Sequence, residues 1–147
     1  MGLLSPGDEE KLRDAFADMT RAVKIVFFTQ TLDCETCLQT RQIIDELPPL
    51  SDKIVVEEAN LVLDADTARR FGIDRVPALA LVGKDEDGQD RDSRIRFLGA
   101  PAGYEFISLV QAVLLVGGGQ STLTDENRRK LAAVDQPTTI QVFTTPT

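Results

Sequence analysis

The stretch TLDCETC, Thr31 to Cys37, contains both cysteines of this 147-residue chain, with two residues between them. Just before it, the β-branched and aromatic run VKIVFFT, Val23 to Thr29, has the composition and length of one buried strand. After it the pattern becomes helical, because the next apolar side chains share a helical face: Cys37, Ile43, Ile44 and Leu47. The two cysteines are therefore predicted to lie on the first turn of a helix that follows a buried strand.

A Cys-x-x-Cys pair in this position indicates redox chemistry. Unpaired N–H groups and the positive end of the helix dipole favour a thiolate on Cys34. The short spacing lets Cys37 attack a mixed disulfide formed at Cys34. Two alternatives remain open at this point. One is half of a zinc site shared between two chains, because this chain has no histidine and no other cysteine; the other is a pair of inert core cysteines.

The rest of the chain alternates predicted helices and strands. A capped amphipathic helix begins at Ser5-Pro6 and ends near Met19, before the first strand. The segments after the cysteine helix read, in order, as strand 53–59, helix 64–71 stopped by Gly72, strands 77–82 and 94–99, and helix 103–116 stopped by Gly117. The helical crossover requires parallel strands in the first half, and the charged turn 83–90 suits an antiparallel hairpin in the second. We therefore predict an α/β fold with a mixed sheet.

An approximate internal repeat follows the glycines at 117–119. DEEKLRDAF near the start is similar to DENRRKLAAV from Asp125, and KIVFFTQT is similar to TIQVFTTPT at the end. We expect residues 1–120 to form one domain and residues 121–147 to begin a second, truncated unit with a helix and a strand. Its strand, TTIQVFTT, has an apolar edge, so we expect it to pair with this sheet, to swap into a neighbour or to associate between chains.

The charge of the chain argues against two classes of partner. With 24 acidic and 16 basic residues, its net charge of -8 repels nucleic acids and anionic membranes. The opening MGLLSPGDEE lacks the basic and apolar regions of a signal peptide, and no apolar run is long enough to span a bilayer. We expect a soluble, cytoplasmic protein. The basic groups are interpreted as solvated faces: Arg69-Arg70, the set Arg91, Arg94 and Arg96, and the run 128–130.

A proline marks the second candidate part of the site. In RVPAL, Pro77 lies 40 positions after Cys37 at the start of the predicted third strand. Proline has no N–H for a β-ladder, so it belongs at a strand start. A trans peptide is the commoner case, but beside a Cys-x-x-Cys motif we expect a cis Val76–Pro77 bond.

Three segments together resemble a known family: VFFTQTLDCETC (26–37), GIDRVPAL (72–79) and GAPAGYEF (99–106). They are similar to the N-terminal thioredoxin-like unit of the glutaredoxin-like protein disulfide oxidoreductases, in the thioredoxin superfamily. The resemblance implies a thioredoxin fold: a mixed four-stranded sheet flanked by helices, with an extra N-terminal helix and a C-terminal helix-strand stub of a second unit. It also implies a role in cell redox homeostasis.

The resemblance assigns roles to individual residues. Cys34 becomes the attacking cysteine and Cys37 the resolving one, while Val76 and Pro77 form a cis-proline loop whose backbone pairs with an extended substrate peptide. No metal is implied, and no cofactor beyond a redox-active Cys34–Cys37 disulfide. The expected partners are protein thiols and disulfides, with an electron donor that is thioredoxin-reductase-like or glutathione-based.

Two positions depart from the thioredoxin pattern. Asp33 replaces the usual tryptophan, and Phe28 replaces a buried carboxylate in the preceding strand. The neighbours Asp33, Glu35 and Thr36 are predicted to tune the thiol. A carboxylate about 6 Å from the sulfur disfavours the thiolate by roughly 0.7 kcal/mol, and the helix end contributes roughly 0.3–1 kcal/mol the other way. We therefore expect a Cys34 pKa near or modestly below that of a free thiol, and a potential nearer the reducing end of the superfamily.

These features predict thiol-disulfide exchange with protein substrates. A binding module that docks a substrate or a reductase is the main alternative, because the motif is acidic. A third interpretation is an electron-relay domain of a peroxide-reducing flavoprotein system, since related tandem units occur there.

Overall fold

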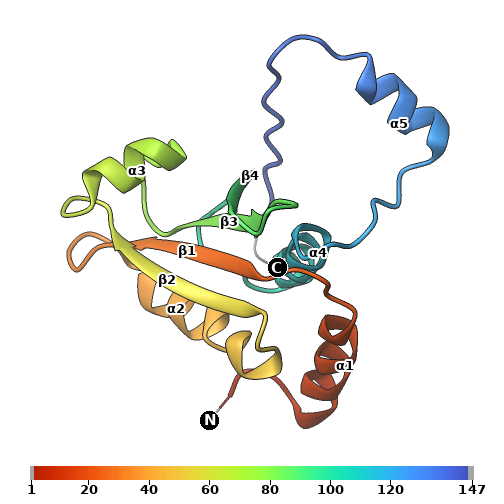
Figure 1. The fold of residues 1–147 in the computed structure, drawn as a ribbon. Helices are drawn as coiled ribbons and strands as arrows, with labels where there is room; N and C mark the ends of the chain where they lie inside the picture. The colour runs from red at the N-terminus through yellow and green to blue at the C-terminus, as the bar shows by residue number, and fades with distance from the viewer. Residues whose placement is uncertain (1, 146–147) are drawn as a thin grey trace.

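The structure is a computed structural model that describes residues 2–145 (Figure 1). Its elements are, in order, α1 (Pro6–Ala17), β1 (Val23–Thr29), α2 (Cys37–Ile44), the 3-10 helix η1 (Pro48–Leu50), β2 (Ile54–Asn60), α3 (Ala65–Phe71), β3 (Ala78–Lys84), β4 (Asp90–Leu98), α4 (Tyr104–Val116) and α5 (Asp125–Ala132). This order confirms the predicted alternation of helices and strands as far as α4.

The four strands form one mixed sheet in the order β2-β1-β3-β4. β1 and β2 are parallel, as the α2 crossover requires, whereas β3 is antiparallel to both β1 and β4. The β3–β4 hairpin closes through Asp85, whose carboxylate accepts hydrogen bonds from the backbone N–H groups of Asp87 at 2.9 Å and Gln89 at 2.8 Å. Gly88 supplies a positive φ of 77° in the same turn.

Alternating side chains of β1 separate two buried clusters, one on each face of the sheet. Val23, Ile25 and Phe27 belong to the larger cluster, which α1, α2 and α4 cover. Val26 and Phe28 belong to the smaller cluster, which α3 covers on the other face. Figure 1 shows α2 and α3 on opposite sides of the sheet. Because β1 is buried from both sides, its sequence is apolar without the polar alternation of a half-exposed strand.

Helix α1 forms as predicted. The Ser5 hydroxyl oxygen accepts a hydrogen bond from the N–H of Asp8 at 3.2 Å and caps the helix, and Pro6 occupies the first helical position. Phe16 and Met19 are buried in the larger cluster. The N-terminal segment is therefore part of the same core as the sheet.

Helix α2 differs from its prediction at the N-terminus. We expected helical structure from Cys34, but α2 begins at Cys37, with Thr36 as its N-cap. The reason is local, because Asp33 adopts a left-handed φ of 55° and turns the chain immediately before the first cysteine. Leu47 lies beyond the end of α2 but is fully buried, so the predicted apolar face is correct.

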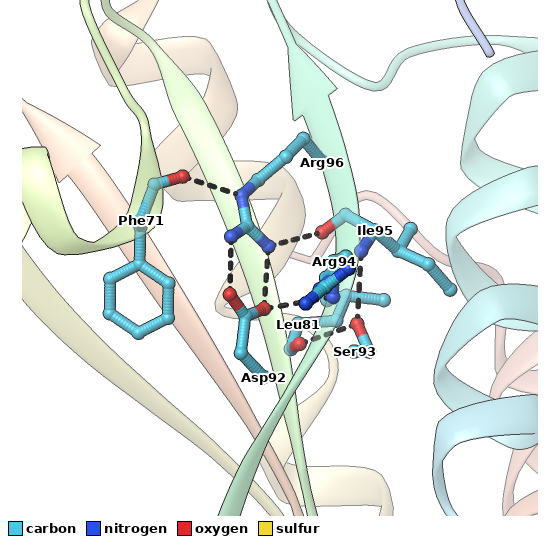
Figure 2. A network of polar contacts seen from close by, with 7 residues as sticks. All are labelled: Phe71, Leu81, Asp92, Ser93, Arg94, Ile95 and Arg96. Atoms are coloured by element: carbon cyan, nitrogen blue, oxygen red, sulfur yellow. Dashed lines mark hydrogen bonds and ion pairs between the residues drawn. The ribbon is translucent and has the colours of Figure 1, made fainter. Parts of the chain in front are cut away.

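Strand β4 starts earlier than predicted and contains an irregularity, where its pairing with β3 shifts between Ala80 and Val82. Arg94 has a positive φ of 64° there. The Ser93 hydroxyl donates to the carbonyl of Leu81 at 2.6 Å and accepts from the N–H of Ile95 at 3.1 Å (Figure 2). These side-chain bonds replace ladder bonds that the bulge interrupts.

Arg96 ties β4 to the end of α3. Its guanidinium donates to both carboxylate oxygens of Asp92, at 2.8 and 2.6 Å, and its Nε donates to the carbonyl of Phe71 at 3.0 Å (Figure 2). The ion pair lowers the pKa of Asp92, with the Arg96 hydrogen bond as the main cause. Arg69 and Arg128 form local ion pairs with Asp66 and Asp125. One arginine of each basic group named in the sequence thus takes part in an intramolecular ion pair.

The predicted strand TTIQVFTT does not form in this chain. Residues 133–145 contain no strand, and Phe143 is 90% exposed, with Ile140 and Val142 also exposed. The physical reason is that a strand is stable only when its backbone groups pair with a neighbour, and no described strand of this sheet lies against the segment. Helix α5, capped by Thr124, does form, but none of its residues is buried.

A lysine-carboxylate cluster at the end of the sheet opposite the cysteines predicts an acid-sensitive contribution to stability. Asp90 accepts hydrogen bonds from the Nζ atoms of Lys84 at 2.6 Å and Lys24 at 2.9 Å. These bonds, that of Lys84 first, lower the pKa of Asp90 from 3.8 to about 2. A depressed folded-state pKa means that the stabilisation is complete above about pH 4 and is lost as the pH falls through about 2.

We therefore expect Asp90→Asn to reduce the free energy of unfolding at pH 7 by less than about 1 kcal/mol, since exposed ion pairs are screened. The difference from the parent protein should fall to a small remainder near pH 2, where Asp90 is about half protonated. Urea denaturation at the two pH values measures this. Asp87→Asn, in the same turn but in no ion pair among the described residues, is the control; an equal effect of both substitutions would contradict the assignment.

Candidate active site

The two cysteines form a disulfide at the junction of the loop after β1 and the start of α2. Their Cα atoms lie 5.5 Å apart. Cys34 is partly exposed, whereas Cys37 is only 7% exposed and packs in the larger cluster. The pair is therefore asymmetric: an incoming sulfur can reach Cys34 from solvent, and Cys37 lies behind it. The loop that carries Cys34 follows the buried strand β1. The end of β1 is tied to the residue after β2, because the carbonyl of Thr29 accepts a hydrogen bond from the N–H of Leu61 at 2.9 Å.

The N-terminus of α2 lies next to the disulfide. Cys37 is the first residue of the helix, and the Thr36 side chain makes no capping hydrogen bond. The Thr36 carbonyl accepts the first helical hydrogen bond, from the N–H of Thr40 at 2.9 Å. The N–H groups of residues 37–39, in the first turn of α2, therefore have no intrahelical partner. These groups and the helix dipole favour negative charge on Cys34 in the reduced protein. Cys34 thus lies in front of the helix rather than within it.

Two carboxylates flank the outer sulfur. The side chains of Asp33 and Glu35 are exposed, and neither takes part in an ion pair with a lysine or arginine of residues 2–145. The backbone of Asp33 is held in its left-handed conformation next to Gln30, whose side-chain amide donates to the Asp33 carbonyl at 3.4 Å. Cys34 is therefore flanked in sequence by two acidic residues that no described lysine or arginine neutralises in an ion pair.

The loop before β3 lies at the same end of the sheet as the disulfide. Antiparallel pairing places Ala78 opposite Phe28, so Val76 and Pro77 approach the loop that carries Cys34, although they are about 40 positions away in sequence. The Val76–Pro77 peptide bond is cis. The Pro77 carbonyl accepts the N–H of Gly99 at 2.9 Å. Val76 and Cys34 both pack against the larger cluster, so the structure brings these predicted site residues together.

Phe28 is fully buried, but it lies on the opposite face of the sheet from the larger cluster, which contains Cys37. It belongs to the smaller cluster, where its ring meets that of Phe71 edge to face at 5.9 Å. Phe27, on the other face, shares the larger cluster with Cys37. The side of the sheet behind the disulfide is therefore apolar.

Sequence reasoning missed the exposed apolar side chains at this end of the sheet. Leu32 is 76% exposed two residues before Cys34, and Leu38 is exposed immediately after Cys37. Val62 and Leu63 are exposed in the turn that Leu61 anchors to β1. Leu32 and Leu38 are visible in TLDCETCL, but nothing in the sequence indicates that their side chains are exposed.

The first turn of α4 places its two aromatic residues differently. Tyr104 is 79% exposed, whereas Phe106 packs against the larger cluster. The reason is helical geometry: Tyr104 is the first residue of α4, and residues two positions apart face different sides of a helix.

A separate hollow of about 380 Å³ lies between the N-terminal segment, α2 and the start of α4. Its lining includes Leu4, Gln42 and Phe106, and neither cysteine contributes to it.

Among residues 2–145, no group of three or more Cys, Asp or Glu side chains is arranged to hold a metal ion. No helix in the described part of the chain is long and apolar enough to cross a membrane.

Two curated relatives match part of the chain. A protein named "Probable Thioredoxin" from Methanothermobacter marburgensis is 32% identical over 89 residues, which are 60% of this chain and 92% of that protein. Its counterpart of the same name from Methanothermobacter thermautotrophicus is 30% identical over the same coverage. No family model matches the chain.

Solved structures match more of the chain. The NTD_N/C domain of alkylhydroperoxide reductase AhpF from Enterococcus faecalis has a TM-score of 0.77 and 28% identity, over 90% of this chain and 62% of that one. A protein disulfide oxidoreductase from Aeropyrum pernix has a TM-score of 0.72 at 24% identity, over 88% of this chain, and it shares the fold. This chain covers only 54% of the latter's length.

Proposed function

The chain belongs to the thioredoxin superfamily, and on that basis we propose that it is an oxidoreductase that exchanges disulfides with protein substrates through Cys34 and Cys37. One observation carries the proposal: the two cysteines are bonded, with the outer one open to solvent and the inner one buried behind it. An inert structural disulfide does not need this asymmetry. Within the superfamily we place the chain with the glutaredoxin-like protein disulfide oxidoreductases, on the segments that carry that resemblance.

The proposed reaction moves two electrons in two steps. In the reduced protein, the Cys34 thiolate attacks one sulfur of a substrate disulfide; a mixed disulfide forms and the other substrate sulfur leaves as a thiolate. The Cys37 thiolate then attacks the Cys34 sulfur, the mixed disulfide breaks, and the second substrate thiolate leaves. The protein ends as the Cys34–Cys37 disulfide and the substrate as a dithiol. In reverse, the same steps oxidise a dithiol.

Substrate binding is proposed to use the backbone of Val76 and Pro77. The Pro77 carbonyl is occupied by Gly99, which leaves Val76 to pair with an extended peptide. Main-chain pairing of this kind gives affinity with little dependence on side chains.

Asp33, Glu35 and Thr36 are proposed to tune the pKa of the Cys34 thiol. The electron donor is a thioredoxin-reductase-like protein or glutathione, and the reaction takes place in the cytoplasm.

Insulin reduction tests this function against a docking role. With dithiothreitol as the terminal reductant, the protein should accelerate insulin precipitation, and Cys34→Ser should return the rate to the uncatalysed background. Background rates for both proteins would leave only a docking module.

A relay domain in a peroxide-reducing system is the second candidate, favoured by the 28% identity and the coverage of the alkylhydroperoxide reductase structure. In this role the disulfide would pass electrons to another protein of the system rather than to general substrates. The two candidates differ in their acceptor: a relay reduces its partner's disulfide much faster than it reduces insulin.

We further propose that residues 121–145 begin a second unit and that their exposed strand segment drives self-association. Ile140, Val142 and Phe143 have no cover in the single chain. We expect the apparent mass in light scattering to rise with protein concentration, and Val142→Asp to restore a monomer, because a buried unpaired carboxylate opposes strand pairing. The same substitution at exposed Leu3, remote in sequence, is the control. A strict monomer at all concentrations would contradict the proposal.

A further inference from the structure

We propose that Asp33 and Glu35 make this site selective for disulfides that carry positive charge near the sulfur atoms. They disfavour anionic partners, so glutathione is the less favoured of the two proposed electron donors. The inference rests on the proposed exchange function and names the substrate class of the same site. The inference follows from the charges near Cys34, because these attract or repel a substrate whose sulfur atom must approach Cys34.

The first observation is that the two carboxylates are not neutralised. Both are exposed on either side of the partly exposed Cys34, and no lysine or arginine of residues 2–145 pairs with them. Across the site, the basic residue of the Val76 loop, Arg75, is already held by both carboxylate oxygens of Asp74, at 2.8 and 3.2 Å. The two loops together therefore present a net negative charge.

The second observation is that basic residues on the elements near the site pair elsewhere. Arg41, the one basic residue of α2, forms ion pairs with Asp45 and Glu58. The lysines that pair with Asp90, Lys24 and Lys84, lie at the opposite end of the sheet. An anionic substrate such as glutathione, with two carboxylates and one ammonium group, is thus repelled by Asp33 and Glu35, while Arg75 and Arg41 are engaged by Asp74 and by Asp45 and Glu58.

The size of the effect follows from Coulomb's law. A unit charge about 6 Å from another changes a rate by about 3-fold at solvent dielectric and by about 2-fold when screened at physiological ionic strength. With two carboxylates, a probe that brings one cationic group to about this distance should react about 100-fold faster at low salt, and about 10-fold faster at physiological salt, than a probe that brings one anionic group there. The dependence on salt is itself a signature of this mechanism.

Three small disulfides of similar size test the proposal: cystamine, which is cationic, 2-hydroxyethyl disulfide, which is neutral, and 3,3′-dithiodipropionate, which is anionic. Oxidation of the reduced protein by each is followed by stopped flow. Each turnover converts the Cys34–Cys37 dithiol to the disulfide and the probe to two thiols. We expect the order cationic, neutral, anionic, with glutathione disulfide among the slow probes.

The double variant Asp33→Asn, Glu35→Gln should reduce the cationic-to-anionic rate ratio by at least about 10-fold at low salt. Because the ratio compares probes on one protein, any change in the Cys34 thiol itself cancels. Asp87→Asn removes a carboxylate in the β3–β4 turn and should leave the ratio unchanged. Equal rates for the three probes, or an unchanged ratio in the double variant, would overturn the selectivity while leaving exchange intact. A protein that reacts with none of the probes would contradict the exchange function and the selectivity together.

Discussion

Replacement of Cys37 by serine is expected to slow release of substrate from Cys34 by at least about 10³-fold, so that a mixed disulfide accumulates. The reason is proximity, because well-oriented intramolecular groups reach effective molarities far above any millimolar external thiol. Cys37 lies three residues from Cys34, with Cα atoms 5.5 Å apart, and is placed to attack the sulfur that holds the substrate. Without it, release depends on thiols from solution.

The measurement is mass spectrometry of the covalent complex after mixing the reduced variant with a disulfide substrate. Cys34→Ser is the matched control. Its remaining cysteine, Cys37, is only 7% exposed, so it should form little mixed disulfide over the same time. Comparable trapping by the two variants would refute the assignment of Cys34 as the attacking residue. That outcome would make Cys37, or both cysteines, open to substrate.

Replacement of Phe27 by alanine is expected to reduce the free energy of unfolding by about 3–5 kcal/mol. Phe27 is almost fully buried in the larger cluster, between the sheet and the helices that cover it. The substitution removes apolar contacts and leaves a cavity that the close-packed neighbours fill only in part. Because small domains are stabilised by only about 5–15 kcal/mol, this single change removes a large fraction of the total.

Phe143→Ala provides the matched control, since it is the same substitution at a side chain that is 90% exposed. It should change the free energy of unfolding by no more than about 0.5 kcal/mol. Urea denaturation of the oxidised proteins, at a concentration where the chain is monomeric, compares the two. Phe27→Leu retains most of the apolar volume and keeps the test available if Phe27→Ala does not fold. Similar losses at positions 27 and 143 would contradict the assigned core.

The bounds of β1 were predictable because they depend on local composition. A seven-residue run of β-branched and aromatic side chains is too short for a typical helix and suits a strand buried on both faces. The stop of α3 at Gly72 was equally readable, since glycine takes the left-handed conformation that ends a helix, with φ of 68° here. In both cases the information lies within the segment itself.

The candidate site was predictable only in its residue types. The Cys-x-x-Cys motif and the Val-Pro pair are visible in the sequence, but their approach depends on the pairing of β1 with β3. The start of α2 at Cys37 depends on the left-handed Asp33, a conformation that aspartate adopts only in some contexts. Arg96 shows the same limit, because its bonds to Asp92 and Phe71 join β4 to the end of α3.

The sequence by itself determined the order of the elements, the parallel and antiparallel halves of the sheet, and the redox motif after a buried strand. Only the tertiary structure decided which cysteine is exposed, that Tyr104 points away from the core, and that residues 138–145 have no strand partner. The physical reason is that periodicity and turn chemistry act between near neighbours in the chain, whereas burial and strand pairing require partners that folding brings from distant positions.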